Sequence, residues 1–261
     1  MTVRVRFLGT GTSFGVPVIG CDCAVCRSSD QRNRRSRHAI VLEEGGRTLL
    51  VDTPPELRVQ ILREGIQRVD AVFLTHLHAD HVHGIDDLRI FSMRSREALP
   101  LFIAGEHERE LRSRFPYIFD DSVEAAPGTS MPELALSTFD DGDDLAVAGF
   151  RLRALAYPHG YTRAYGFRTG GLGVVVDAKD VPPPARDILR DVDVLVINAL
   201  WSGRTHPTHM NVEEAVAMAG ELGARRTYLT HLTHYVEYVD LRSRLPAGIE
   251  PAYDGLTIEV D

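Results

Sequence analysis

The sequence predicts an α/β fold in which two β-sheets pack face to face with helices outside, a four-layer αββα sandwich. Apolar runs of strand length fall into two blocks along the chain, and helical patterns accompany each block. The 261 residues suit one domain, which we assign to the whole range 1–261. Composition does not separate this sandwich from a doubly wound sheet, so the choice depends on the residues that carry chemistry.

The predicted strands are apolar segments bounded by turn residues. The first block comprises residues 3–8, 39–42, 48–51, 71–74 and 101–104, and the second comprises residues 150–156, 165–168, 173–176, 192–197, 226–229 and 256–260.

Two helices carry clear start signals. Thr53, followed by two prolines and Glu56, predicts an N-cap, a proline in the first turn and a capping box. Asn211, with Glu214 three residues later, predicts a second capped helix. Leu57, Ile61 and Leu62 are the expected buried stripe of the first helix. Weaker helical patterns cover residues 86–94, 106–115, 184–189 and 236–244.

Charge and hydropathy restrict the partners and the compartment. The chain has a formal net charge of −8, which argues against nucleic acid as a partner, because such partners are held by basic side chains. No apolar run is long enough for a membrane helix. The N-terminus alternates arginine with apolar residues, which is typical of a strand and not of a secretion signal. We therefore expect a cytoplasmic protein.

The run His76-Leu-His78-Ala-Asp80-His81 directly follows the predicted strand 71–74. In an extended chain the side chains of residues two apart point to the same face, so His76 and His78 can bind one ion. Asp80 and His81 lie where the chain turns and can serve a second ion. Three further candidates, His159, Asp177 and His231, each follow a later predicted strand. Strand ends from distant segments converge on a shared edge, so together these residues predict a two-metal site.

The three cysteines of the chain form a second signal. Cys21, Cys23 and Cys26 lie within six residues, in a loop after a glycine-rich turn. In a reducing cytoplasm, an odd cluster of thiols is typical of a zinc site that needs one more ligand. The sequence by itself leaves the fourth ligand open, and His38 or His107 would serve as well as any other histidine. We assign residues 21–26 as a zinc-binding loop.

These separated motifs resemble the metallo-β-lactamase superfamily of hydrolases, whose fold is the αββα sandwich. The resemblance implies that one ion is bound by His76, His78 and His159. It implies that Asp80, His81 and His231 bind the other ion, with Asp177 bridging the two. Asp52, at the end of the strand 48–51, is expected to accept a hydrogen bond from a ligand imidazole.

The glycine-rich turn, the cysteine cluster and the segment Thr230-His-Leu-Thr-His234 resemble one branch of the superfamily, the phosphoribosyl cyclic phosphate phosphodiesterases. In this branch the residue that matches His234 is the fourth zinc ligand. The residue that matches His209 is an active-site histidine, which we expect to be the general acid, with His206 as a weaker candidate. We assign His209 and Asp80 to catalysis. A purely structural role for His209 stays open.

The expected reaction is the hydrolysis of a small cyclic phosphate diester, most simply a ribose-linked one, by a hydroxide that bridges two metal ions. The expected cofactors are two divalent catalytic ions, zinc or manganese, and one structural zinc. The resemblance also suggests a homodimer. Three alternatives remain: a nuclease similar to the tRNA 3′-processing enzymes, a thioester hydrolase, and a zinc-stabilised binding module without turnover.

Overall fold

The computed structural model describes residues 2–120 and 122–261. Within these residues, fourteen strands form two sheets of seven strands each. The first sheet has the order β14-β1-β2-β3-β4-β5-β6 and the second has the order β13-β12-β11-β10-β9-β8-β7. The predicted α/β sandwich is confirmed.

The bounds of the strands follow. The first sheet contains β1 (Val3–Gly9), β2 (Ala39–Glu44), β3 (Arg47–Val51), β4 (Ala71–Phe73), β5 (Leu99–Ala104), β6 (Leu134–Phe139) and β14 (Thr257–Val260). The second contains β7 (Asp144–Val147), β8 (Phe150–His159), β9 (Thr162–Thr169), β10 (Leu172–Val175), β11 (Val194–Asn198), β12 (Arg226–Thr230) and β13 (Ile249–Pro251).

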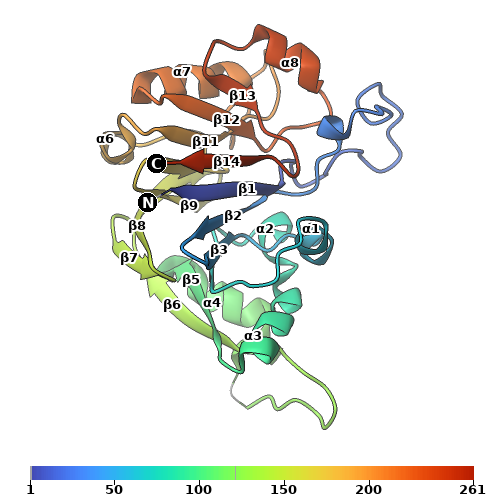
Figure 1. The fold of residues 1–261 in the computed structure, drawn as a ribbon, viewed down its shortest axis with the longest axis vertical. Helices are drawn as coiled ribbons and strands as arrows, with labels where there is room; N and C mark the ends of the chain where they lie inside the picture. The colour runs from blue at the N-terminus through green and yellow to red at the C-terminus, as the bar shows by residue number, and fades with distance from the viewer. Residues whose placement is uncertain (1, 121) are drawn as a thin grey trace.

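Helices cover the outer faces of the two sheets, as Figure 1 shows for α1 to α4 beside the first sheet and α6 to α8 beside the second. They are α1 (Leu57–Arg63), α2 (Ala79–Val82), α3 (Arg89–Ser95), α4 (Gly105–Arg114), α5 (Pro116–Phe119), α6 (Pro183–Leu189), α7 (Val212–Leu222) and α8 (Tyr238–Arg244). Short 3₁₀ helices lie at Gln31–Asn33 and Ile85–Leu88. No helix of residues 2–120 and 122–261 combines the length and the apolar character needed to cross a membrane.

The apolar core has three parts, and alternate residues of one strand enter different parts. In β3, Leu49 and Val51 lie between the two sheets, whereas Leu50 packs beneath the helices on the outer face. In β11, Val196 lies between the sheets and Leu195 packs beneath the helices of the second sheet. Both faces of these strands are buried, which explains why their sequences are continuously apolar and do not alternate.

The three strands that the sequence did not predict are β6, β7 and β13, and each is an edge strand of its sheet. β7 and β13 are short and β6 is mostly exposed or half-buried, so these three strands lack the apolar run by which a buried strand is recognised. The remaining predicted strands are present, with bounds that differ by a few residues.

The predicted start of α1 is wrong. The helix begins at Leu57, and no side chain caps its N-terminus. The hydroxyl of Thr53 instead lies 3.4 Å from the carbonyl oxygen of His81, and the backbone N–H of Thr53 donates to the same oxygen at 2.7 Å. Tertiary contact with the histidine-rich segment therefore overrides the local capping signal. Leu62, expected in the buried stripe, is 64% exposed.

The capped helix α7 is confirmed. The side chain of Asn211 accepts from the backbone N–H of Glu214 at 2.8 Å, and Glu214 Oε2 accepts from the backbone N–H of Asn211 at 2.9 Å. The helix ends at Leu222 and is capped by Gly223, whose φ of 68° lies in the left-handed region that glycine adopts without strain. This reciprocal cap fixes the end of the segment that carries His206 and His209.

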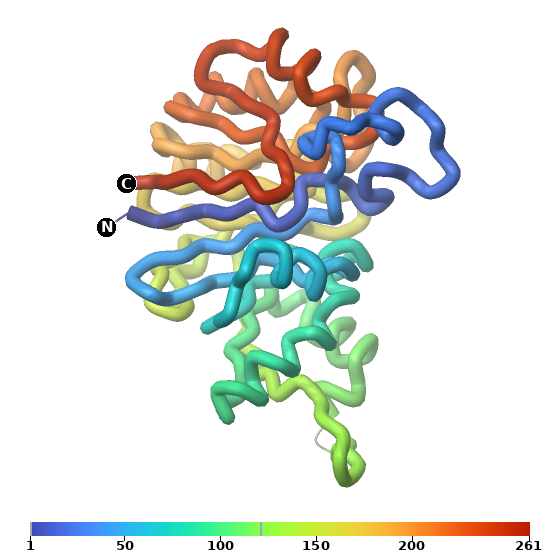
Figure 2. The backbone as a smooth tube through the Cα atoms, turned by 45° about the vertical axis from the view of Figure 1, so that its right-hand side comes forward, coloured from blue at the N-terminus to red at the C-terminus, as the bar shows by residue number. Residues whose placement is uncertain are grey.

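Two features of the topology place chemistry-bearing residues at one edge of the sandwich. Strands β10, β11 and β12 are parallel neighbours, so Asp177 and His231, which follow β10 and β12, leave the sheet at the same edge. The loop after β1 also reaches this edge, where Gly11 pairs with Leu232. Figure 2 shows this N-terminal loop beside the C-terminal segments of the chain.

Candidate metal centres

The structure brings the seven predicted ligands of the catalytic site together at the edge of the sandwich. His76 and His78 lie in the turn between β4 and α2, and Asp80 and His81 are in α2. His159 ends β8, Asp177 follows β10, and His231 follows β12. They form two adjoining clusters, each with its ligand atoms within 4.8 Å of one another.

The first cluster contains three imidazoles and one carboxylate. His78 Nδ1 lies 3.0 Å from His76 Nε2 and 3.0 Å from His159 Nε2. Asp177 Oδ2 lies 3.6 Å from His76 Nε2 and 3.7 Å from His159 Nε2. Four donor atoms therefore converge on one point, as the shell of a tetrahedral ion requires.

The second cluster shares its carboxylate with the first. His81 Nε2 lies 3.3 Å from Asp177 Oδ2 and 3.4 Å from Asp80 Oδ2. His231 Nδ1 lies 3.3 Å from Asp177 Oδ1. Asp177 Oδ2 thus lies beside imidazoles of both ligand sets and Oδ1 faces His231, which is the arrangement of a bridging ligand.

Unpaired polar atoms show that the residues present fit a pair of cations. His81 Nε2, Asp177 Oδ1 and His231 Nδ1 are buried, and none has a hydrogen-bond partner within residues 2–120 and 122–261. Buried polar atoms are almost always paired, because an unpaired one costs about 1–3 kcal/mol. Three such atoms in one cluster, all with lone pairs that suit a metal ion, indicate a divalent cation as their partner.

The backbone at this edge is strained where it presents site residues. Asp52, Asp177 and His231 have φ values of 65°, 55° and 60°, in the left-handed region that residues with a side chain rarely adopt. Such conformations cost about 1–3 kcal/mol each and persist where the surroundings enforce them, often at functional sites. Asp52 and His231 directly follow a strand and Asp177 follows one after a single residue, so in each case the turn directs the side chain into the cluster.

A second layer of contacts orients the ligand imidazoles. Asp52 Oδ2 lies 2.7 Å from His81 Nδ1, and Asp52 Oδ1 accepts from the backbone N–H of Thr75 at 2.9 Å. His159 Nδ1 donates to the carbonyl oxygen of Thr208 at 3.1 Å. These contacts leave Nε2 of both histidines free for a metal. The sequence pointed to Asp52, but nothing in its pattern indicated Thr75 or Thr208.

Burial keeps most of the ligand imidazoles in the form that binds a metal. It lowers the pKa of His76 well below its ordinary value and that of His231 to about 4. His81 differs, since the carboxylates of Asp177, Asp52 and Asp80 outweigh the effect of burial and raise its pKa. Metal binding requires the neutral imidazole, so a cation would displace the proton from His81.

His209 lies at the edge of the ligand cluster, and His206 lies behind it. His209 Nε2 is 3.2 Å from Asp177 Oδ2, whereas His209 Nδ1 is 2.8 Å from Thr208 Oγ1. His206 Nδ1 is 3.3 Å from His209 Nδ1 and touches no residue of the two ligand sets. Of the two candidates, His209 is therefore the one whose imidazole faces the site.

The cysteine cluster is completed by His234. Its Nδ1 lies 3.3 Å from Cys21 Sγ, 3.6 Å from Cys23 Sγ and 3.5 Å from Cys26 Sγ. The backbone N–H of Cys26 donates to Cys23 Sγ at 3.4 Å and lowers the pKa of that thiol to about 6. Three sulfurs and one imidazole nitrogen fit a tetrahedral zinc ion.

The two other histidines considered for this shell lie elsewhere. His38 is fully buried, with Nδ1 3.2 Å from Thr230 Oγ1. His107, in α4, has Nε2 3.0 Å from the carbonyl oxygen of Arg163. The segment that carries His234 is held by the buried Arg35, whose Nη1 donates to the carbonyl oxygens of Thr233 at 2.9 Å and Val236 at 3.0 Å.

Comparison with known proteins agrees with this geometry. A family model described as beta-lactamase superfamily domain matches residues 47–232, a range that includes every ligand of the two catalytic clusters. The chain belongs to this superfamily.

Solved structures support the superfamily assignment across the whole chain. A diphosphatase from the PhnP family is 37% identical, with a TM-score of 0.91 over 99% of this chain and 97% of that one. Zinc-bound PqqB from Methylobacterium extorquens shares the fold at 18% identity, with a TM-score of 0.75 over 98% and 99% of the two chains.

The chain spans about half the length of the curated relatives it matches. A protein of Porphyromonas gingivalis named octanoyltransferase is 34% identical over 99% of this chain and 52% of its own length. Ribonuclease Z of Anoxybacillus flavithermus is 33% identical over 64% of this chain and 47% of its own length.

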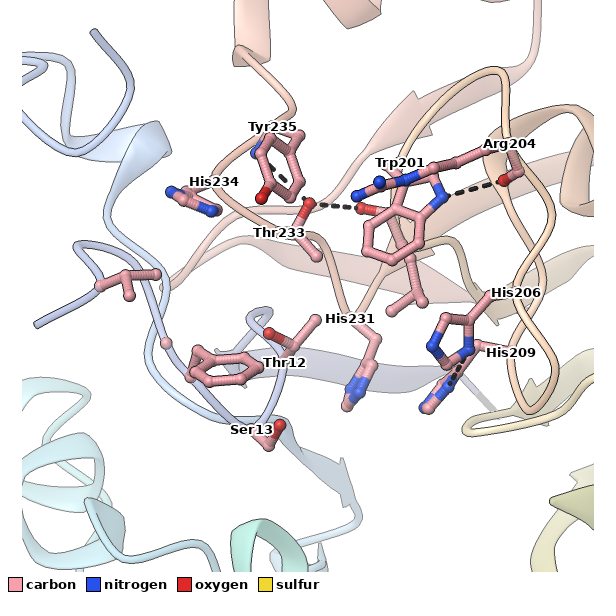
Figure 3. Close-up of a pocket in the computed structure, with 14 residues that line it drawn as sticks. Thr12, Ser13, Trp201, Arg204, His206, His209, His231, Thr233, His234 and Tyr235 are labelled. Atoms are coloured by element: carbon pink, nitrogen blue, oxygen red, sulfur yellow. Dashed lines mark hydrogen bonds between the residues drawn. The ribbon is translucent and has the colours of Figure 1, made fainter. Parts of the chain in front are cut away.

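Two cavities lie beside the two ligand clusters at the edge of the sandwich. One, of about 340 Å³, lies on the side of His78 and Tyr161. The other, of about 410 Å³, lies on the side of Trp201 and is drawn in Figure 3. His209 and His231 line both cavities. The sequence did not point to either cavity, because the residues of their walls come from separate loops.

Proposed function

We propose that this chain is a metal-dependent phosphodiesterase and that its substrate is a small, ribose-linked cyclic phosphate. The observation that carries the proposal is the position of His209 Nε2, 3.2 Å from the carboxylate of Asp177 that joins the two ligand sets. A proton donor beside a two-cation site suits a reaction in which an alkoxide departs from phosphorus. The 37% identity to a diphosphatase of the PhnP family supports the same chemistry.

The site residues have two roles in this proposal: some would bind the cations, and others orient the ligand imidazoles. His76, His78, His159 and Asp177 would hold one divalent cation, and Asp80, His81, His231 and Asp177 would hold the other. When bound, such a cation pair activates water and neutralises charge on phosphoryl oxygens. Asp52 and the Thr208 carbonyl hold the imidazoles of His81 and His159 in the orientation that presents Nε2.

His209 is proposed as the general acid. In the structure its Nε2 faces Asp177 Oδ2, and its Nδ1 faces the hydroxyl of Thr208. A proton on Nε2 therefore lies at the edge of the ligand cluster, open to both cavities. Donation of this proton to the leaving oxygen is a step commonly worth about two to four powers of ten in rate.

We propose zinc or manganese for the two catalytic ions and zinc for the cysteine site. Imidazole and carboxylate ligands accept either metal, whereas three thiolates favour zinc. The three free cysteines support a reducing cytoplasm as the compartment. The homodimer stays a prediction, which the molar mass in solution will test.

A ribonuclease is the second candidate, favoured by the ribonuclease Z relative. One experiment separates the candidates. The metal-loaded protein is assayed on cyclic ribose phosphates, linear diesters, a tRNA precursor and a thioester, with a chelator-treated sample as control. Turnover of cyclic ribose phosphates well above all others supports the proposal. Preference for the tRNA precursor or the thioester contradicts it.

A further inference from the structure

The larger cavity beside the metal centre has an aromatic wall. Trp201 and Tyr235 line it together with His206, His209 and His231 (Figure 3), and the ring centroids of Trp201 and His206 are 5.4 Å apart. The ring centroids of Trp201 and Tyr235 are 6.0 Å apart with an interplanar angle of 72°. The Tyr235 side chain is 65% exposed, although burying such a ring is favourable. An aromatic surface left open to solvent in a cavity is typical of a ligand site.

A planar cation already lies on this surface. The guanidinium carbon of Arg204 is 4.2 Å from the centroid of the Trp201 ring and 5.3 Å from that of Tyr235. Arg204 is exposed and forms no ion pair with any residue of the described chain. The indole is held in place, because Trp201 Nε1 donates to the carbonyl oxygen of Arg204 at 2.9 Å. The Trp201 indole is therefore preorganised, whereas the Arg204 guanidinium that covers it has no ion pair to hold it within the described residues.

The cavity adjoins the reacting centre. His209 and His231 belong both to its wall and to the ligand cluster around Asp177. A group attached to a phosphorus atom at the metals can therefore extend into the cavity. Thr12 adds a hydroxyl group to the lining, whereas the Thr233 hydroxyl already donates to the carbonyl oxygen of Leu200 at 2.9 Å. The aromatic rings of the wall suit a flat group better than an aliphatic chain.

We propose that this cavity binds a planar heteroaromatic ring, of which a nucleobase is the common example, carried by an alcohol of the phosphodiester. The ring stacks on Trp201 or Tyr235, where the Arg204 guanidinium lies in the free protein. This inference rests on the proposed function, since it names the substrate class of the same site.

The chain offers a direct probe, because Trp201 is its only tryptophan. The metal-loaded protein is titrated with AMP and, separately, with ribose 5-phosphate, while tryptophan fluorescence is recorded. A free tryptophan amide titrated in parallel corrects for absorption by the ligand. We expect AMP to change the fluorescence in a saturable way, and ribose 5-phosphate, which lacks a base, to bind at least about fivefold more weakly. Equal responses to the two ligands would overturn the inference.

Three variants test the wall itself. Tyr235→Leu should weaken AMP binding at least about fivefold, the loss expected when one stacking ring is removed. Tyr235→Phe keeps the ring and should bind AMP as the unmodified protein does. Tyr117→Leu removes a partly exposed ring on α5, outside this cavity, and should also leave binding unchanged. Equal loss in Tyr235→Phe and Tyr235→Leu, or none in either, contradicts the stacking role.

The same samples separate this inference from the proposed function. Zinc content of each variant shows whether Tyr235, whose ring lies 4.3 Å from that of His234, disturbs the cysteine site. Phosphodiester turnover without a base-dependent fluorescence response leaves the function intact and overturns the ring site. Base-dependent binding without turnover of any phosphodiester supports the ring site and overturns the function.

Discussion

His231 and His234 lie three residues apart on the segment after β12, yet their imidazoles belong to two different ligand clusters. His231 lies beside Asp177 in the catalytic site, and His234 lies beside the three cysteine sulfurs. His231 also has a left-handed backbone conformation, with φ of 60°. The loop of the three cysteines therefore lies at one end of a short strained segment whose other end supplies a residue of the catalytic cluster.

Loss of the cysteine site should weaken the catalytic site. In Cys23→Ser we expect the zinc content to fall by about one ion per chain, because a structural zinc site needs all four ligands. We expect turnover to fall about tenfold or more, since His231 loses its anchor. Metal analysis and kcat measure the two effects. His83→Ala, which removes an exposed imidazole, is the control. Normal turnover in a Cys23→Ser protein that lacks this zinc would show that the two sites are independent.

Asp52→Asn should lower catalytic metal affinity without unfolding the chain. Asparagine tolerates the left-handed φ of 65° at this position and can still accept from Thr75. With its single oxygen facing Thr75, the asparagine presents its NH2 group to His81 Nδ1, and this donor cannot replace the carboxylate oxygen that lies there at 2.7 Å. We expect metal affinity or activity to fall about 10–100-fold, measured by competition with a chelator. An unchanged metal affinity would remove Asp52 from the support of His81.

His209→Ala should retain both catalytic ions and lose turnover. The imidazole of His209 lies beside Asp177 and forms a third group of possible ligands with Asp177 and His231. In the proposed site the two ions are held by the other imidazoles and carboxylates, so His209 is not needed to bind them. We expect kcat to fall about 10²–10⁴-fold with unchanged metal content. His206→Ala, one step further from the cluster, should lose much less. A phosphodiester with an acidic phenol as leaving group needs little protonation, so its hydrolysis should be less affected. Equal losses on both substrates would contradict the role as acid.

Glu106 connects α4 to β9, the strand that pairs with the end of β8 and so supports His159. Its carboxylate accepts from Arg163 Nη2 at 2.8 Å and from Tyr165 Oη at 2.9 Å. Burial acts to raise the pKa of Glu106, but these hydrogen bonds outweigh it and lower the pKa. A lowered carboxyl pKa gives stability that is present above the unfolded value and is lost as pH falls through the folded value.

The effect of Glu106→Gln on thermal stability should therefore depend on pH. At neutral pH we expect Tm to fall by about 2 °C, and the difference should vanish in acid, below the folded pKa. Glu108→Gln, which removes an exposed pair with Arg112 within α4, is the matched control. Tm of the three proteins is measured across the acid range with metal in excess. A difference in Tm between Glu106→Gln and the unmodified protein that grows as pH falls would contradict this prediction.

The local patterns of the sequence were sufficient for much of the fold. Buried strands such as β3 and β11 are continuously apolar because both of their faces are covered, and this makes them visible in the sequence. The capping box of α7 is also local, and the structure forms it as predicted. Thr53 carries the same kind of signal, but its backbone and hydroxyl face His81, so tertiary contact prevailed over the local pattern.

The sequence by itself determined which residue types carry the chemistry, since the spacing of His76, His78 and the cysteines already restricts what they can bind. Only the tertiary structure decided how distant residues combine. It placed His234, and not His38 or His107, beside the three sulfurs, and it joined Trp201 to Tyr235 in one cavity wall. The physical reason is that spacing along the chain encodes local geometry, whereas strand order and crossover connections bring remote strand ends to a common edge.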